Sequence, residues 1–144
     1  MRTYIILAFT LLSLIIESCC DENDSYSGVI ISVIDLDFIN YTNLNLPHTG
    51  CIQTDSSYKS LVTEPSLWDE MPLVDFTKQS VLINYKHVNN RIFCDRNVII
   101  DSIKKNVTYT VFAESCNCMD KCKNYDYNIV IVPKIGSDFK ILYK

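Results

Sequence analysis

The second half of the chain is a succession of short segments rich in β-branched and aromatic residues, and this feature constrains the fold most. The segments span residues 80–85, 91–94, 98–104, 107–114, 127–133 and 139–143. In residues 107–114, apolar side chains at odd positions alternate with mostly polar ones at even positions, which predicts a strand with one apolar face. Asn89-Asn90 and Lys105-Asn106 lie between such segments, where asparagine tolerates the positive φ of a tight hairpin. We therefore predict consecutive antiparallel strands joined by short loops.

The first half of the chain adds one long strand, a candidate short strand over residues 51–54 and one helical segment. Residues 28–39, with the sequence GVIISVIDLDFI, are rich in β-branched residues and are predicted as a single strand, followed by a loop over residues 40–50. Thr54 is the predicted N-cap of a helix that Pro65 interrupts, because Tyr58, Leu61 and Val62 share one helical face. The predicted fold class is α+β, mainly an antiparallel β-sheet or sandwich with one short helical segment near residues 56–71.

Two smaller features refine this prediction. Trp68, the only tryptophan of the chain, is expected to fill the core between the helix and the sheet, because an indole buries a large area. Asp75 is expected to cap the turn that leads into the strand over residues 80–85.

The N-terminus, residues 1–24, predicts an exported and lipid-anchored chain. Arg2 precedes an apolar run over residues 4–16, which is short for a membrane-spanning helix and typical of a signal-peptide core. Residues 16–19, Ile-Glu-Ser-Cys, resemble a bacterial lipobox, and Cys19 fits the acylated position better than Cys20. We expect a lipoprotein signal peptide at 1–18, a lipidated tether at 19–27 and a single β-rich domain at 28–144. An ordinary secretory signal followed by an accidental cysteine pair is the alternative.

Charge and location narrow the classes of partner. The acidic residues after Cys19 resemble the surface-export signals of Bacteroidota-type lipoproteins, so the expected location is the bacterial cell envelope, at the outer membrane or the cell surface. The expected membrane contact is the N-terminal lipid. The net charge of the chain is −4 and there is no basic cluster, which argues against nucleic acid as a partner.

The cysteines after Cys20 are predicted to form disulfides, because cysteines in an oxidising compartment pair by default. The candidates are Cys51, Cys94, Cys116, Cys118 and Cys122, and their connectivity stays open. Cys116, Cys118 and Cys122 also cluster closely enough to suggest a zinc or redox site as the alternative, with a fourth ligand supplied from elsewhere.

Catalytic patterns are poor. His48 is expected in an exposed loop, and His87 is expected to be structural. Asp35 and Asp37 share one strand face, as a pair of glycosidase carboxylates would, but a solvated strand face predicts the same residues. We therefore predict no catalytic residue and no cofactor.

Residues 58–134 resemble a family of small bacterial lipoproteins related to the C-terminal domain of a protease-complex-associated lipoprotein. The resemblance is carried by residues 58–61, by the Trp68 segment, by residues 72–82 with the sequence PLVDFTKQSVL, and by residues 130–134, VIVPK. It implies a β-rich domain with one helix that stabilises or restrains a surface protease. Residues 89–92, Asn-Asn-Arg-Ile, replace the Gly-Gly-Tyr segment that is usual in the family.

The expected function is therefore that of a non-catalytic, lipid-anchored envelope protein that binds another protein, with a surface protease as the implied partner. The alternative is a metal-binding or redox lipoprotein that uses the three clustered cysteines. A eukaryotic secreted glycoprotein is a third reading, because Asn40-Tyr41-Thr42 and Asn106-Val107-Thr108 match the glycosylation tripeptide.

Overall fold

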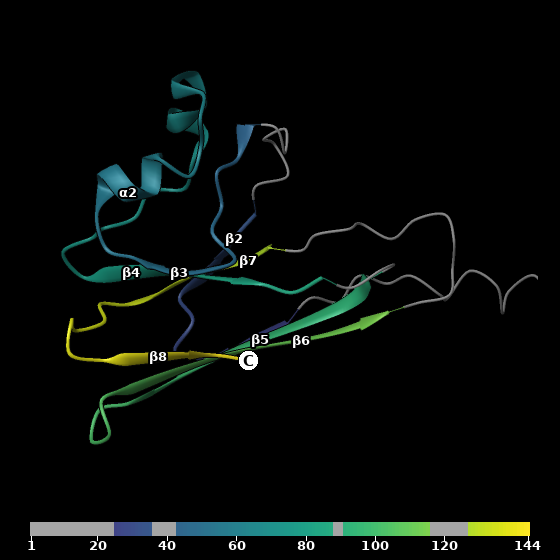
Figure 1. The fold of residues 1–144 in the computed structure, drawn as a ribbon, viewed down its shortest axis with the longest axis vertical. Helices are drawn as coiled ribbons and strands as arrows, with labels where there is room; N and C mark the ends of the chain where they lie inside the picture. Colours follow the sequence, from purple (N-terminus) through teal and green to yellow (C-terminus); the bar gives the residue numbers. More distant parts are fainter. Residues whose placement is uncertain (1–24, 36–42, 88–90, 116–126) are drawn as a thin grey trace, which may run out of the picture.

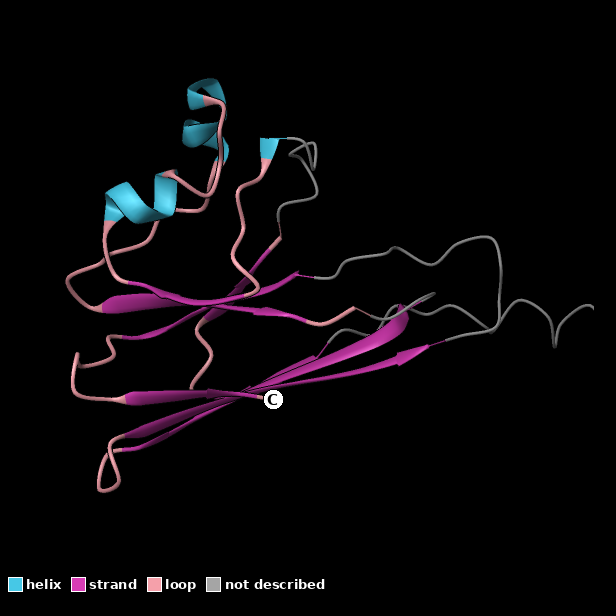
Figure 2. Ribbon diagram, in the orientation of Figure 1, coloured by secondary structure: helices cyan, strands magenta, loops and turns pink. Residues whose placement is uncertain are grey.

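The described residues form two stacked β-sheets, with short helical segments on the outer side of one of them (Figure 1; Figure 2). The computed structural model describes residues 25–35, 43–87, 91–115 and 127–144. In this part of the chain each sheet has four strands, in the orders β1-β5-β6-β8 and β2-β7-β4-β3. The strands are β1 (Ser25–Gly28), β2 (Ser32–Ile34), β3 (Thr49–Ile52), β4 (Gln79–Tyr85), β5 (Arg91–Asp101), β6 (Asn106–Ser115), β7 (Tyr127–Pro133) and β8 (Lys140–Tyr143). The predicted α+β class, with a mainly antiparallel sandwich, is confirmed.

The pairing of the strands is less regular than the sequence predicts. Antiparallel pairs join β5 to β6, β4 to β7, β3 to β4 and β2 to β7, but β1 pairs with β5 and β8 pairs with β6 in parallel. Neighbours in the parallel pairs are far apart in the sequence, so short hairpin loops do not connect them.

The β5–β6 hairpin corrects two details of the prediction. β5 is one unbroken strand from Arg91 to Asp101, although its polar centre suggested two shorter strands. At the turn, positive φ falls on Lys105 (52°) rather than on Asn106, which is already the first residue of β6. The carboxylate of Asp101 holds the turn, because its Oδ1 accepts hydrogen bonds from the N–H groups of Ile103 (3.1 Å) and Lys104 (2.9 Å).

Residues 28–39 were predicted as one strand, but their described part, residues 28–35, crosses from one sheet to the other. Gly28 has φ of +75°, and a Cβ at this position would lie 2.1 Å from the carbonyl oxygen of Val98. The N–H of Val29 then donates to Val98 O (3.0 Å) in the first sheet, and the N–H of Ile31 donates to Ile131 O (2.8 Å) in the second. The described domain includes Ser25, three residues before the expected boundary at 28.

The sheet β2-β7-β4-β3 is buried on both faces. Odd-numbered residues of β4 and β7, such as Val81 and Ile131, belong to a core cluster with the helical segments. Even-numbered residues, such as Leu82 and Val130, belong to a second cluster with the strands of the other sheet. The near-continuous apolar runs of these two strands follow from this double burial.

The helical segments cover the outer face of this sheet, and we call residues 54–71 the helical cap. It contains helix α2 (Asp55–Lys59) and the 3₁₀ helix η2 (Pro65–Glu70). Thr54 is the N-cap of α2, as predicted, and its Oγ1 accepts a hydrogen bond from the N–H of Ser57 at 3.3 Å. Tyr58 is buried together with Leu61 and Val62, which confirms the predicted apolar face.

Candidate functional site

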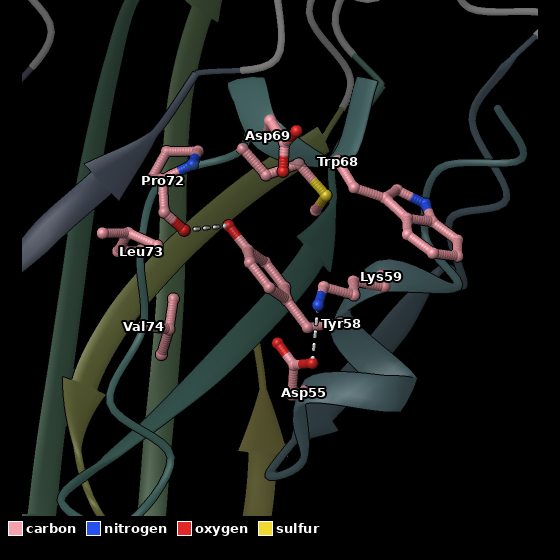
Figure 3. Close-up of a pocket in the computed structure, with 9 residues that line it drawn as sticks. Asp55, Tyr58, Lys59, Trp68, Asp69, Pro72, Leu73 and Val74 are labelled. Carbon is pink, nitrogen blue, oxygen red and sulfur yellow. Dashed lines mark hydrogen bonds and ion pairs between the residues drawn. The ribbon is translucent and has the colours of Figure 1, made fainter. Parts of the chain in front are cut away.

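A pocket of about 180 Å³ opens between the helical cap and the segment that follows it (Figure 3). The buried Tyr58 and Met71 lie at its base, and the remaining lining residues surround its opening. The complete lining consists of Asp55, Tyr58, Lys59, Trp68, Asp69, Met71, Pro72, Leu73 and Val74. Pockets for small-molecule ligands usually enclose about 300–1,000 Å³, so this one has room for a single side chain.

Two hydrogen bonds hold the walls of the pocket in place. The Tyr58 hydroxyl donates to the carbonyl oxygen of Pro72 at 3.1 Å, which ties α2 to the opposite wall (Figure 3). Burial raises the pKa of Tyr58 to about 12, so the phenol keeps its proton at neutral pH. The Trp68 indole N–H donates to Val62 O at 3.2 Å and fixes the ring at the rim.

Apolar side chains at the rim are unusually exposed. Leu73 is 98% exposed. Trp68 is 37% exposed, so the prediction that it fills the core is wrong. The hydrogen bond of the indole explains the difference, because it ties the ring to the backbone of the helical cap, where part of the ring stays exposed.

Charged groups of both signs border the same pocket. Lys59 Nζ lies 2.9 Å from the Asp55 carboxylate and 5.9 Å from the centroid of the Trp68 ring. The Asp69 carboxylate forms no hydrogen bond or ion pair with any residue that the structure describes. The helical cap carries a net charge of −3, from Asp55, Glu64, Asp69 and Glu70 against Lys59 alone.

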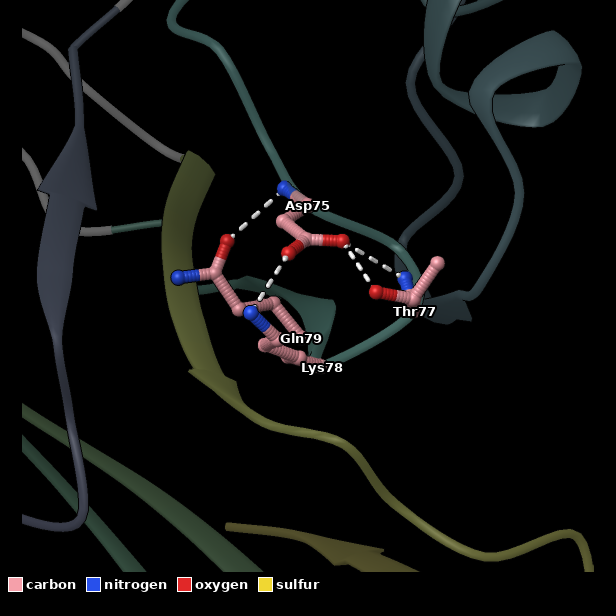
Figure 4. A network of polar contacts seen from close by, with 4 residues as sticks. All are labelled: Asp75, Thr77, Lys78 and Gln79. Atoms are coloured by element: carbon pink, nitrogen blue, oxygen red, sulfur yellow. Dashed lines mark hydrogen bonds and ion pairs between the residues drawn. The ribbon is translucent and has the colours of Figure 1, made fainter.

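Two of the motifs that carry the sequence resemblance, residues 72–82 and 130–134, meet at the turn of Asp75. Residues of the resemblance motifs also line the pocket, among them Tyr58, Trp68 and Leu73. Asp75 caps its turn as predicted: its Oδ1 accepts from the N–H and the hydroxyl of Thr77, and the Gln79 side chain accepts from the Asp75 N–H (Figure 4). The hydrogen bonds from Thr77 lower the pKa of Asp75. Lys134, from the late strand motif, donates to Phe76 O at 2.8 Å and to Gln53 O at 3.2 Å. These contacts are internal, so Asp75, Thr77 and Lys134 stabilise the turn before β4.

A buried polar network between the sheets was not identified from the sequence. Arg96 is only 5% exposed, and its Nε donates to Asn128 Oδ1 at 3.0 Å. The Tyr109 hydroxyl donates to Asn128 O at 3.1 Å, and burial raises the pKa of Tyr109. The alternation of side chains along the strand could have predicted the burial of Arg96, because it lies between the inward-facing Cys94 and Val98. The network joins the two sheets and is closed to solvent.

The cysteine predictions fall partly on described residues. Cys94 donates from its thiol to Asn128 Oδ1 at 3.0 Å, and Cys51 is a half-buried thiol on β3 whose pKa is raised by burial. No disulfide joins these two residues. The predicted lipidation site, Cys19, and the clustered Cys116, Cys118 and Cys122 lie outside the described residues, so lipidation, disulfide pairing and the alternative metal site stay predictions.

The histidines and carboxylates considered for catalysis are scattered. His48 is exposed, as expected, and its ring contacts Tyr85 edge-on at 4.7 Å between centroids. Asp35 is exposed after β2, and Asp37 lies outside the described residues. Within the described ranges, no three His, Cys, Asp or Glu side chains lie together in a way that could hold a metal ion.

Comparison with known proteins found no family model, no curated protein and no solved structure that matches this chain. No helix in the described part of the chain is long and apolar enough to cross a membrane. The pocket at the helical cap is therefore the candidate site on its own geometry.

Proposed function

We propose that this chain is a non-catalytic, lipid-anchored protein of the bacterial cell envelope that binds another protein through the pocket at the helical cap. The observation that carries the proposal is the almost complete exposure of Leu73, on the side of the pocket opposite Trp68 (Figure 3). Exposed apolar surface around a pocket marks an interaction site, and tryptophan is enriched among the few residues that supply most of the binding energy of protein interfaces.

The size and chemistry of the pocket favour a protein partner over a small-molecule substrate. About 180 Å³ admits one side chain, which a neighbouring surface of the partner would deliver. The phenol of Tyr58 donates to Pro72 O, and its raised pKa makes it a poor proton acceptor at neutral pH. These features support binding without chemical conversion.

The course of the chain supports presentation of this site away from a membrane. Ser25 begins β1 and pairs with Asp95, next to Arg96, which contacts Asn128 of the other sheet. Asn128 pairs with Asn84 at the end of β4, whereas the Asp75 turn precedes the start of β4 and lies at the opposite end of the sandwich. Leu73 lies two residues before that turn. A chain tethered through Cys19 would hold the Asp75 end outward, toward a partner at the cell surface. The sequence resemblance directs the search for that partner to a surface protease.

The binding proposal is tested by capture from the native envelope with the full-length lipoprotein as bait. Leu73→Asp is the test variant. Ile103→Asp is the matched control, because Ile103 is 95% exposed in the β5–β6 turn of the other sheet. We expect one envelope protein to co-purify with the wild type and with Ile103→Asp, and to be lost with Leu73→Asp. Equal capture by both variants would contradict the assignment of the pocket.

The anchoring proposal has its own test. Wild-type protein is expected in the membrane fraction of the producing cell, and Cys19→Ser is expected in the soluble fraction, because two or more acyl chains give stable anchoring. Cys20→Ser is the matched control and should stay with the membrane. Release of the Cys20→Ser variant in place of Cys19→Ser would move the acylated position by one residue.

A further inference from the structure

We propose that the occupant of the pocket is a lysine or arginine side chain of the partner protein, an inference that rests on the proposed binding function. A long basic side chain has an apolar stem and a cationic end, and it places the stem on apolar surface while the charge stays in a polar environment. The lining of the pocket offers both kinds of surface.

The apolar part of the pocket suits the stem. Tyr58 and Met71 lie at the base, and Leu73 and Val74 form one wall together with Pro72. Trp68 borders the same opening, and a guanidinium or ammonium over an indole face gains cation–π attraction. Lys59 Nζ already lies 5.9 Å from the centroid of this ring, which shows that its surroundings accept a cation.

The charges around the opening suit the cationic end. Asp55 is neutralised by Lys59 at 2.9 Å, so Asp69 is the lining carboxylate that has no ionic partner among the described residues. A neutral apolar side chain would fill the pocket but would remove water from Asp69 without compensation. An acidic side chain would meet a cap with a net charge of −3. A basic side chain satisfies Asp69 and reduces that charge.

The single tryptophan of the chain makes this inference directly measurable, because Trp68 fluorescence reports on the pocket alone. The probe is a short acetylated and amidated peptide with one central arginine. The matched probe carries citrulline in its place, which keeps the shape and removes the charge. Both are titrated into the full-length protein and into Asp69→Asn. Glu70→Gln serves as the control because it removes the same charge one residue away, from a side chain that does not line the pocket.

We expect the arginine peptide to change the Trp68 emission in a saturable manner that weakens as salt is added. The Asp69→Asn variant should bind it about fivefold more weakly, as for the loss of one exposed ion pair, and Glu70→Gln should differ less than twofold. Equal binding of the citrulline peptide, unchanged binding to Asp69→Asn, or no saturable change with the arginine peptide would overturn the inference. Envelope capture that depends on Leu73 but not on Asp69 would overturn the basic occupant and leave protein binding intact, whereas capture independent of Leu73 would remove the proposed function itself.

Discussion

The sheet β2-β7-β4-β3 has two covered faces that are built differently. On the inner face, the strands of a second sheet supply a residue at every second position, so Leu82, Val130 and Val132 are fully buried. On the outer face, the described cover consists of a five-residue helix, a six-residue 3₁₀ helix and loop residues such as Leu44 and Phe76. Such short segments bury Tyr58 but leave a pocket beside it. Continuous strand pairing closes a surface, whereas short helical turns leave places where a partner can insert a side chain.

Polar groups also differ between the two faces: they are buried on the inner face and exposed on the outer face. Between the sheets, the Asn128 side chain accepts from Cys94 and from Arg96 and is closed to solvent. In the helical cap, Asp69 lies exposed at the pocket rim. The inner face therefore supplies rigidity, and the outer face supplies the adaptable surface, in agreement with the general placement of binding residues on a stable scaffold.

The largest expected effect tests the packing of the two faces with the same substitution. Leu82→Ala, in the inner core, should lower the free energy of unfolding by about 3 kcal/mol, because the flanking strands cannot collapse into the cavity. Leu61→Ala, in the helical cap, should cost about 2 kcal/mol, because the short segments can settle. Urea denaturation measures both, and an equal or larger cost at Leu61 would break the comparison.

The next effect concerns the polar network of the inner face. Asn128→Ala should destabilise the protein by about 2 kcal/mol, because it leaves the buried donors of Arg96 and Cys94 without this acceptor. Asn97→Ala is the matched control, because Asn97 Oδ1 is buried without a hydrogen bond to any described group, and its loss should be nearly neutral. Similar losses in thermal or urea denaturation for the two variants would show that the network adds nothing.

A smaller effect is expected where the helical cap begins. Thr54→Ala removes the hydroxyl that accepts from the Ser57 N–H, which should lower the free energy of unfolding by about 1 kcal/mol. Thr54→Ser should retain this N-cap hydrogen bond. Hydrogen exchange should accelerate in α2 and leave β4 and β7 unchanged. Faster hydrogen exchange throughout β4 in Thr54→Ala would mean that the helical cap and the inner core open together.

The last effect is absent at neutral pH and confined to alkaline solution. Folding raises the pKa of Tyr58 from 10.0 to about 12, so its neutral form contributes fully below pH 10. That contribution is lost as the pH rises from 10 through 12, because the unfolded chain releases the proton first. Tyr58→Phe should therefore flatten this part of the stability curve, measured by urea denaturation at several pH values. If the stability of Tyr58→Phe falls between pH 10 and 12 as steeply as that of the wild type, the loss of stability comes from Tyr109 and Tyr143, whose pKa values burial also raises.

Much of the local structure follows from the amino-acid sequence by itself. The alternation in residues 107–114 predicted the inward face of Val107, Tyr109 and Val111, and all three are buried. Thr54 and Asp75 were predicted as caps, and both accept hydrogen bonds from the N–H groups that follow them. Such features depend on residues within one or two turns of each other, so their patterns lie within a short window of sequence.

The tertiary structure alone decided which segments meet. Residues 28–39 were predicted as one strand, but the division of residues 28–34 between two sheets depends on the carbonyl of Val98, which lies close to Gly28 only after folding. The parallel pairing of β1 with β5, the burial of Arg96 and the exposure of Trp68 likewise depend on contacts between distant segments. The pocket also depends on the tertiary structure. In the sequence Leu73 does not differ from a core leucine, and only the fold shows that no described residue covers it. Local propensity carries no information about a neighbour that is distant in the chain, and for that reason the candidate site emerged only from the structure.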